Sequence, residues 1–275
     1  MMGGIFRRPV LLIGLVVTLA LVGVALLSLV WTPSLPSKMN IVQRLKPPLG
    51  PGGLLGSDQF GRDVASMLMV GAWNSLSTSF LAVAIGATVG SAVGVIVAMQ
   101  RGWLELIVMR GCDIIFAVPP ILSAMMLGAF LGSGRFTAII AIAVFMVPVF
   151  ARLTLAGAKQ IWARDYVTAA VGIGRSKAKI TLVHILPNIS NQIIVQVTIQ
   201  LGLAILTEAG LSFLGLGMPP PAPTWGRMLA DSQTFFGQAP WLAILPGMAI
   251  AIAVLGLNML GDGLRDMLDP KTKAC

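Results

Sequence analysis

Long apolar runs with few or no charged residues alternate with short polar stretches along this 275-residue chain. A membrane-spanning helix needs roughly 20 apolar residues, and six runs provide them. A transmembrane barrel would need shorter strands of alternating polarity, which the runs do not show. The pattern therefore predicts an all-α integral membrane protein with six transmembrane helices. The expected spans are residues 10–30, 76–98, 114–134, 136–158, 180–207 and 232–261.

Prolines in two of these spans are expected to perturb the helix. Pro119 and Pro120 fall in the third span and Pro187 falls near the start of the fifth. Proline removes a backbone hydrogen bond and kinks a helix, so we expect a kink in the third span and a break in the fifth. The kink fits either a packing bend or a gate. Before the third span, residues 101–113 predict an amphipathic turn that lies on the inner face of the membrane.

Composition supports the membrane assignment. Hydrophobic residues make up 56% of the chain and charged residues only 11%, against about 25% charged residues in a typical soluble domain. The first apolar run follows Arg7 and Arg8, as a secretory signal would, but it exceeds the apolar core of about 7–15 residues that signals use. We expect it to be retained as the first helix.

The chain has a net charge of +9, and the distribution of its basic residues predicts how it is oriented in the membrane. Membrane proteins concentrate Lys and Arg in cytoplasmic segments, which explains the excess without a nucleic-acid partner. With both termini in the cytoplasm, 13 of the 19 basic residues lie inside. These inner residues are Arg7, Arg8, Arg101, Arg110, Arg152, Lys159, Arg164, Arg175, Lys177, Lys179, Arg265, Lys271 and Lys273.

No catalytic or metal-binding pattern is present. The chain lacks the G-x-x-x-x-G-K-[ST] phosphate loop, and the glycines at 172 and 174 lack the third glycine of a dinucleotide fingerprint. His184 is the single histidine, and Cys112 and Cys275 both fall on the reducing inner side, which predicts no disulfide. We therefore expect no enzymatic activity, no metal and no cofactor in this chain.

Acidic residues are expected only near the ends of spans, where Glu208 and Asp262 fall. Ion-coupled transporters and channels keep charged groups within the membrane for function. The sequence thus disfavours an ion-coupled transporter, and it predicts that energy comes from a partner. A passive membrane scaffold is the other alternative, although a scaffold would not need the patterned loop described next.

The polar segment 159–187 lies between two spans and is the most patterned part of the chain. Residues 165–171 predict a short helix, and Tyr166, Ala169, Ala170 and Ile173 recur on one face of it. Gly172 and Gly174 should end the helix, because glycine readily adopts left-handed conformations. A short helix and a glycine turn make a compact knob on the cytoplasmic face.

Two longer stretches are expected on the outer face, residues 31–70 and 208–240. In the first, Asp63 can cap the helix that follows it, and nearby glycines turn the chain. In the second, three consecutive prolines at 219–221 exclude a helix, and Trp225 fits the aromatic belt at the membrane surface.

Four blocks of sequence resemble one family. The order Ala169-Ala170, Gly174 and then residues 184–187 resembles the cytoplasmic coupling loop of ABC-importer permeases. The stretch at 56–66 and the blocks at 208–229 and 257–270 resemble the C-type subunits of dipeptide, oligopeptide and nickel permeases. The outer signature that carries the second resemblance is Gly56, Asp58, Gly61, Arg62 and Asp63.

The resemblance implies a type I ABC importer permease fold and a division of the chain. Residues 1–70 would hold the N-terminal tail, the first helix and the outer segment, and residues 71–275 the permease domain with coupling loop 159–187. Two departures are visible: the family usually has Arg where this chain has Trp73, and the general loop motif has Glu where this chain has Thr168. The residues implied to dock an ATPase are Asp165, Tyr166, Ala169, Ala170, Gly172, Gly174, Leu186 and Pro187.

The resemblance also implies partners and cargo. We expect a second, homologous permease, two subunits that bind ATP and Mg, an extracytoplasmic solute-binding protein and membrane lipid, in a bacterial plasma membrane. Dipeptides or oligopeptides are the expected cargo, and nickel is the alternative within the family. Charged residues of the outer loops, among them Lys46, Arg62 and Asp231, are expected to contact the binding protein.

The predicted orientation leads to a labelling experiment. A membrane-impermeant thiol reagent applied to intact cells should label neither Cys112 nor Cys275, because both are expected inside. Strong labelling of Cys275 from outside would contradict the orientation.

Overall fold

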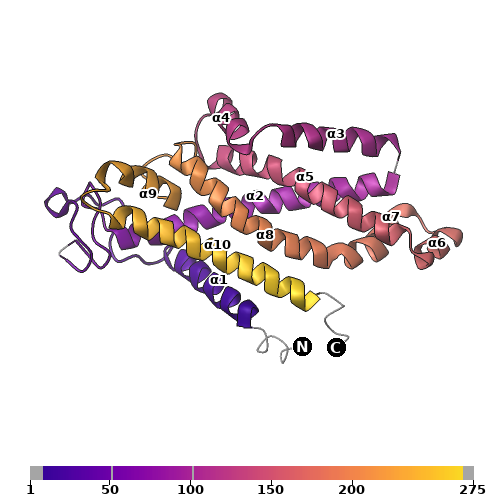
Figure 1. Ribbon diagram of the computed structural model, residues 1–275, viewed down its shortest axis with the longest axis horizontal. Coiled ribbons are helices and arrows are strands. Elements are labelled where there is room, and N and C mark those ends of the chain that lie inside the picture. Colours follow the sequence, from indigo (N-terminus) through magenta and orange to yellow (C-terminus); the bar gives the residue numbers. More distant parts are fainter. Residues whose placement is uncertain (1–8, 51, 101, 269–275) are drawn as a thin grey trace.

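Long helices that lie side by side form the body of the molecule (Figure 1). The computed structural model describes residues 9–50, 52–100 and 102–268. Outside the described residues lie Arg7, Arg8, Arg101 and Cys275. Within the described part, five helices are long and apolar enough to cross a membrane, or six if one bent pair counts as a span.

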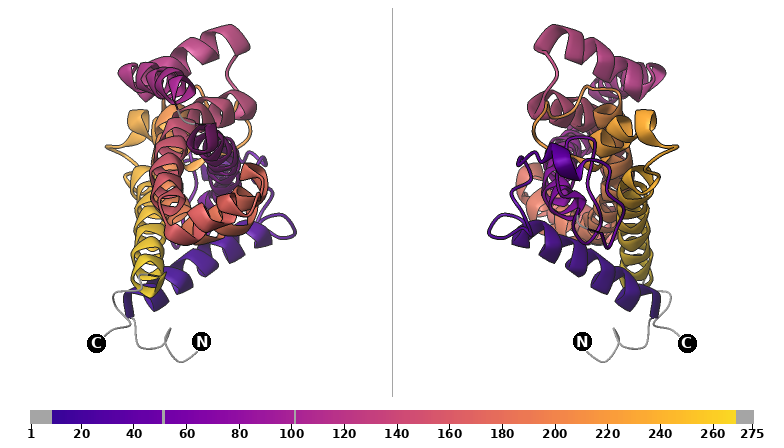
Figure 2. Two further views of the ribbon diagram at one scale, coloured as in Figure 1. Left: turned by 90° about the vertical axis from the view of Figure 1, so that its right-hand side faces the viewer. Right: turned by 90° about the vertical axis from the view of Figure 1, so that its left-hand side faces the viewer.

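The five long helices are α1 (Pro9–Leu27), α2 (Val64–Gln100), α5 (Arg135–Trp162), the helix Lys177–Phe213 that includes α8, and α10 (Trp241–Leu268). The short helix α6 (Asp165–Gly172) lies at one end of the bundle and α9 (Trp225–Ser232) at the other (Figure 1). We call these the α6 end and the α9 end. Helix α1 packs along α10, on the side of the bundle away from α3 and α4 (Figures 1 and 2).

Glycines bring α2 and α5 into close contact. Gly86, Gly90 and Gly94 recur every four residues on the face of α2 that meets α5. A Cβ atom at Gly90 would lie 2.5 Å from the carbonyl oxygen of Val147 and 2.8 Å from Cβ of Phe150. Small residues at such spacing let membrane helices approach until their backbones touch. The contact is therefore made of backbone against backbone, with no room for a side chain.

The expected third span is two helices rather than one kinked helix. α3 (Trp103–Ala117) and α4 (Pro120–Leu131) meet at an angle of 88°. Pro119 cannot donate to the preceding turn and restricts Val118 to an extended conformation (φ −96°, ψ 127°), which ends α3. Pro120 then begins α4. The prolines thus break the span instead of bending it.

The amphipathic stretch before this break also differs from expectation. Instead of a turn on the membrane surface, it forms most of α3, which runs along α5. Lys159 Nζ and Glu105 Oε1 lie 2.5 Å apart, and Arg152 donates to Asp113. These pairs step forward along α3 and backward along α5, so the two helices are antiparallel.

Pro187 does not break the fifth span. The helix runs from α7 (Lys177–Ile180) through a π-helical turn (η3, Thr181–Ile185) into α8 (Leu186–Phe213). In a π-helical turn each hydrogen bond spans five residues instead of four, so the turn is wider. The wider turn relieves the clash of a proline ring with the carbonyl four residues earlier. The break expected from the proline is therefore absorbed within one continuous helix.

Close packing of α2 on α5 gives a stability prediction. Gly90→Ala should lower the apparent midpoint of thermal unfolding in detergent, because overpacking costs about 1–3 kcal/mol. The matched control is Gly111→Ala on α3, where a new Cβ would meet no atom within 4 Å. The control should be neutral or stabilising by up to about 1 kcal/mol, since alanine favours helix. Equal behaviour of the two variants would contradict the packing account.

Candidate functional site

The helix expected at residues 165–171 is present as α6, and the turn after it follows the glycine argument. Gly174 has φ +80°, a left-handed conformation that other residues adopt at a cost, whereas Gly172 remains in the helix. The amide of Arg175 donates to the carbonyl of Ala170 at 3.1 Å and closes the turn. Helix, turn and α7 thus form a compact projection at the α6 end (Figure 1).

The inward face of α6 differs from the single small-residue face that the sequence predicts. Val167 and Ala170 are buried and pack in one apolar cluster with Leu155 and Ala158 of α5 and with Ile180. Ala170 therefore holds the projection onto the body of the protein. Tyr166, Ala169 and Ile173 remain exposed on the outward side.

The exposed surface of the projection is apolar at its centre and charged at its edge. Ile173 is 78% exposed, and Tyr166 and Val171 are about half exposed. The residues around this patch that are also exposed are Asp165, Thr168, Ala169, Gly172, Arg175, Lys177 and Lys179. Exposed apolar side chains ringed by charge are typical of a surface that binds another protein.

Aromatic and polar contacts join α6 to the long helix behind it. The rings of Tyr166 and His184 meet edge to face with their centroids 6.0 Å apart, and Arg175 Nη1 lies 3.4 Å from His184 Nε2. Leu186 is half-buried and Pro187 exposed one turn further on. These contacts connect α6 directly to η3, which continues into α8.

At the α9 end, the outer signature forms a buried ion pair. Asp58 and Arg62 are 3% and 7% exposed, and Asp58 Oδ2 accepts from both Nε and Nη2 of Arg62 at 2.6 Å. Asp58 Oδ1 accepts from the amides of Phe60 and Arg62 at 2.9 and 2.7 Å. The Arg62 guanidinium also lies over the Phe60 ring, 5.0 Å from its centroid. Every oxygen of the carboxylate is thus used within the loop.

The remaining signature residues shape the same loop. Gly56 and Gly61 have φ values of +81° and +71°, and a Cβ at Gly61 would collide with the carbonyl of Asn40. Asp63 caps α2, because its Oδ2 accepts from the amide and hydroxyl of Ser66 at 2.8 and 2.6 Å. The helix start predicted from the sequence is therefore present.

Residues after α8 fold back onto α2, so two sequence expectations there are wrong. Trp225 is 1% exposed rather than at the membrane surface, and its Nε1 donates to the carbonyl of Leu68 at 3.2 Å. Asn74 donates to the carbonyl of Pro223 at 2.7 Å. The stretch 208–240 is also more helical than a loop, since it includes the end of α8, α9 and η4 (Gln233–Phe235).

Glu208 corrects the expectation that the spans hold no buried acid. It lies in α8, five residues before the helix ends, and is 1% exposed. Its Oε1 accepts from the Ser212 hydroxyl at 2.6 Å. The argument against an ion-coupled transporter can therefore not rest on missing buried carboxylates.

The charges expected to meet a delivery protein are mostly engaged within the chain. Asp58 binds Arg62, and Arg227 Nε donates to Asp231 at 3.0 Å. Lys46 remains exposed. The exposed surface of segment 31–63 is largely apolar instead, through Met39, Ile41, Val42, Leu49 and Leu54.

Two features that the sequence interpretation missed have a simple spacing. The glycines of α2 recur every four residues, and so do the carboxamides Asn188, Gln192, Gln196 and Gln200 along α8. We call these four residues the amide row. Because positions four apart share a helix face, both patterns were visible in the sequence as stripes.

Comparison with known proteins assigns this chain to a protein family. Residues 86–274 match the family described as binding-protein-dependent transport system inner membrane component. This match covers more than half of the chain, so the chain belongs to that family of transport permeases. Handling of ATP by partner ATPase subunits is implied by the family.

Individual permeases of known systems are similar to this chain. The chain is 38% identical over 268 residues to the dipeptide transport system permease protein DppC of Alkalihalophilus pseudofirmus, covering 98% of this chain and 88% of that protein. It is 44% identical over 218 residues to the glutathione transport system permease protein GsiD of Escherichia coli, covering 79% and 72%. GsiD of Pectobacterium atrosepticum is 40% identical over 220 residues, covering 80% and 73%.

Among solved structures, an inward-facing form of the MetNI methionine ABC transporter is similar in fold. The match has a TM-score of 0.62 at 19% identity and covers 74% of this chain and 96% of that one. This likeness supports the permease fold alone.

The buried pair of the outer signature yields a prediction. Asp58→Asn leaves the Arg62 charge buried without its partner, which typically costs about 3–5 kcal/mol. We expect segment 31–63 to become susceptible to limited proteolysis. Asp231→Asn is the control, because its half-exposed pair with Arg227 is worth about 0–1 kcal/mol. Wild-type protease resistance of Asp58→Asn would show that the pair does not hold the segment.

Proposed function

We propose that this chain is a permease subunit of an ATP-driven importer of dipeptides and short peptides. The observation that carries the proposal is the 38% identity to a dipeptide permease over 98% of the chain. The similarity to glutathione permeases favours a second cargo of the same chemistry, because glutathione is itself a tripeptide. Both cargoes present amide bonds and free carboxylates.

In this proposal the chain works within a complex. A second, homologous permease completes the pathway, two ATPase subunits bind ATP and Mg, and a solute-binding protein delivers cargo from outside. The α6 end faces the cytoplasm, with both termini there, and the α9 end faces outward. The sequence count of 13 basic residues in the segments expected inside, against six in those expected outside, supports this orientation.

The exposed face of α6 is the proposed contact with an ATPase subunit. Asp165, Tyr166, Ala169, Gly172 and Gly174 form or border it, while Ala170 holds it from behind. Leu186 and Pro187 belong to the long helix to which movements of the ATPase would be transmitted through α6. That helix spans 37 residues, about 55 Å at 1.5 Å per residue, and so reaches from α6 to the α9 end.

The residues of the outer signature are proposed to have a structural role. Gly56, Gly61, Asp58, Arg62 and Asp63 fix the segment that covers the α9 end. The exposed apolar residues of that segment offer the binding protein a surface. Alternating access then follows from differential binding of partners and ATP to two states of the complex.

Reconstitution tests the proposed function. We expect uptake of trialanine into proteoliposomes to require this chain, its paired permease, both ATPases, ATP on the ATPase side and the binding protein. The purified chain alone should give no trialanine flux under any imposed pH gradient. Gradient-driven uptake by the single chain would contradict the proposal and favour an ion-coupled transporter.

Substitution at the glycine turn tests the ATPase contact. Gly174→Asp needs a positive φ at a cost of about 1 kcal/mol or more and adds a charged side chain beside the proposed docking face. It should abolish transport while insertion and pairing with the second permease persist. Gly132→Asp is the control, because Gly132 also has φ +80° and open space around it. Normal transport by fully expressed Gly174→Asp would show that this surface does not dock the ATPase.

A further inference from the structure

A groove at the α6 end of the membrane-spanning part has the chemistry of a peptide site. It measures about 540 Å³, within the range of small-molecule sites. α8 supplies most of its lining, and Leu153 of α5 and Arg265 and Leu268 of α10 complete it. Three residues of the amide row, Asn188, Gln192 and Gln196, belong to this lining, together with Asn191.

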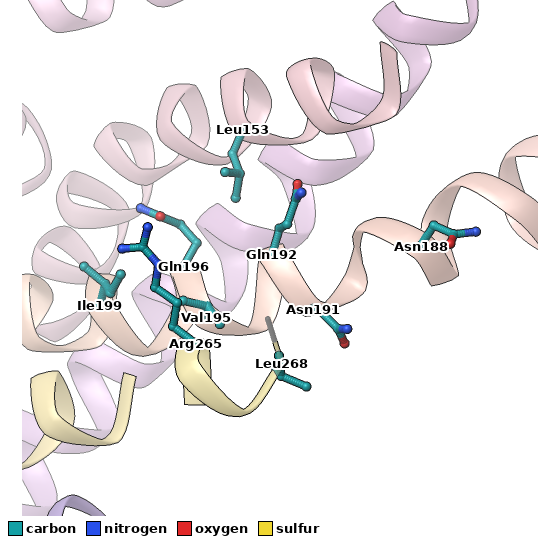
Figure 3. A pocket seen from close by; sticks show the side chains of 9 residues that line it. All are labelled: Leu153, Asn188, Asn191, Gln192, Val195, Gln196, Ile199, Arg265 and Leu268. Atoms are coloured by element: carbon teal, nitrogen blue, oxygen red, sulfur yellow. The ribbon is translucent and has the colours of Figure 1, made fainter. Parts of the chain in front are cut away.

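Two polar side chains of the lining lie together, and a third extends toward α5. In Figure 3, the side chain of Gln196 lies beside the Arg265 guanidinium, and Gln192 extends toward Leu153, whereas Asn188 and Asn191 point away along the helix. Gln192 fits because α5 has Gly157 there: a Cβ on Gly157 would lie 2.7 Å from Gln192 Oε1. Leu153, Val195 and Ile199 supply the apolar part of the groove.

A carboxamide side chain on a membrane-spanning helix destabilises the protein unless it forms hydrogen bonds with water or polar partners. Moving an amide into an apolar environment without a hydrogen bond costs about 2–7 kcal/mol, so an amide row on a spanning helix is unsuited to face lipid. Gln200, further along the row, satisfies this condition by turning into the core, where its Nε2 lies 3.0 Å from Met146 Sδ. Gln192 and Gln196 instead border open space.

The groove matches one class of ligand. A carboxamide both donates and accepts hydrogen bonds, as a peptide bond does, so Gln192 and Gln196 can bind a peptide backbone whatever its side chains. A guanidinium binds a carboxylate through two parallel hydrogen bonds, and Arg265 is the one charged residue among the described residues of the lining. Backbone amides followed by a terminal carboxylate describe the C-terminal end of a peptide.

We propose that Gln192, Gln196 and Arg265 form a contact site for the C-terminal end of a peptide at the cytoplasmic exit of the pathway. This inference rests on the proposed peptide importer and its orientation, which place the groove on the inner side. The site recognises what all peptides share, so it accepts cargo without selecting among sequences. An anionic lipid headgroup offers the same negative oxygens, and the experiment separates the two sources.

Cargo protection of a cysteine in the groove tests the site. Val195→Cys, an apolar position of the same lining, is introduced into the assembled transporter with Cys275→Ser and the buried Cys112 retained, in nanodiscs without binding protein. Mass spectrometry then follows modification by a small neutral maleimide. Trialanine should slow modification about tenfold at ten times its half-protecting concentration. Ile194→Cys, on the same helix but outside the lining and 48% exposed, should be modified at an unchanged rate.

Removing the guanidinium tests the carboxylate contact. With Arg265→Gln added, the half-protecting concentration of trialanine should rise at least about tenfold, because the charge-assisted hydrogen bonds to its carboxylate are lost. The half-protecting concentration of C-terminally amidated trialanine should not change. An equal effect on both peptides would overturn the assignment of Arg265.

Other outcomes overturn the site as a whole. Protection that requires phosphatidylglycerol in place of phosphatidylcholine, and not trialanine, would assign the groove to a lipid headgroup. A Val195→Cys that is unreactive in the complex but reactive in the isolated chain would assign the groove to the contact with the second permease. Unprotected cysteine in a transporter that imports trialanine would refute the groove alone, whereas absent uptake by the wild type would refute the proposed function.

Discussion

The contact between α2 and α5 is the constraint on which the rest of the structure depends. In lipid, helices gain nothing from burying apolar surface against one another, so they associate by close packing and polar contacts. Gly86, Gly90 and Gly94 allow the α2 backbone to touch α5. α5 in turn carries α3 through two ion pairs and α6 through the cluster around Val167. The position of the α6 projection is therefore set by glycines in the middle of the bundle.

α8 connects the features to which we assign function. It begins beside α6, carries the amide row past the groove, and ends near Glu208 and the residues that fold onto α2. The π-helical turn at 181–185 keeps the helix continuous despite Pro187. One continuous helix, Lys177–Phe213, thus joins the proposed ATPase contact, the proposed peptide site and the α9 end.

Sequence rules for helix starts and ends correctly predicted those structures that depend on neighbouring residues. The helix at 165–171, the left-handed Gly174 and the Asp63 cap depend on neighbouring residues alone, and all three are present. The assignment of the family rested on motif order and is confirmed. Errors arose where tertiary packing decides. The burial of Trp225, Ala170 and Glu208 depends on helices distant in sequence.

The proline predictions failed for a related reason. Pro119 and Pro120 together restrict more backbone than one kink can absorb, and the chain turns by 88°. Pro187 lies where a widened turn was available, and the helix continues. Sequence shows that a proline perturbs a helix, but the surrounding packing determines whether the result is a corner or a bulge.

Site-specific cross-linking tests most directly whether the outward face of α6 meets an ATPase. Ala169→Cys carrying a photoreactive maleimide should, in the transport-active complex, give an adduct whose mass equals this chain plus one ATPase subunit. Leu54→Cys, exposed in the outer segment at the opposite end, should give no such adduct. An ATPase adduct at Leu54→Cys, or none at Ala169→Cys despite intact transport, would contradict the account.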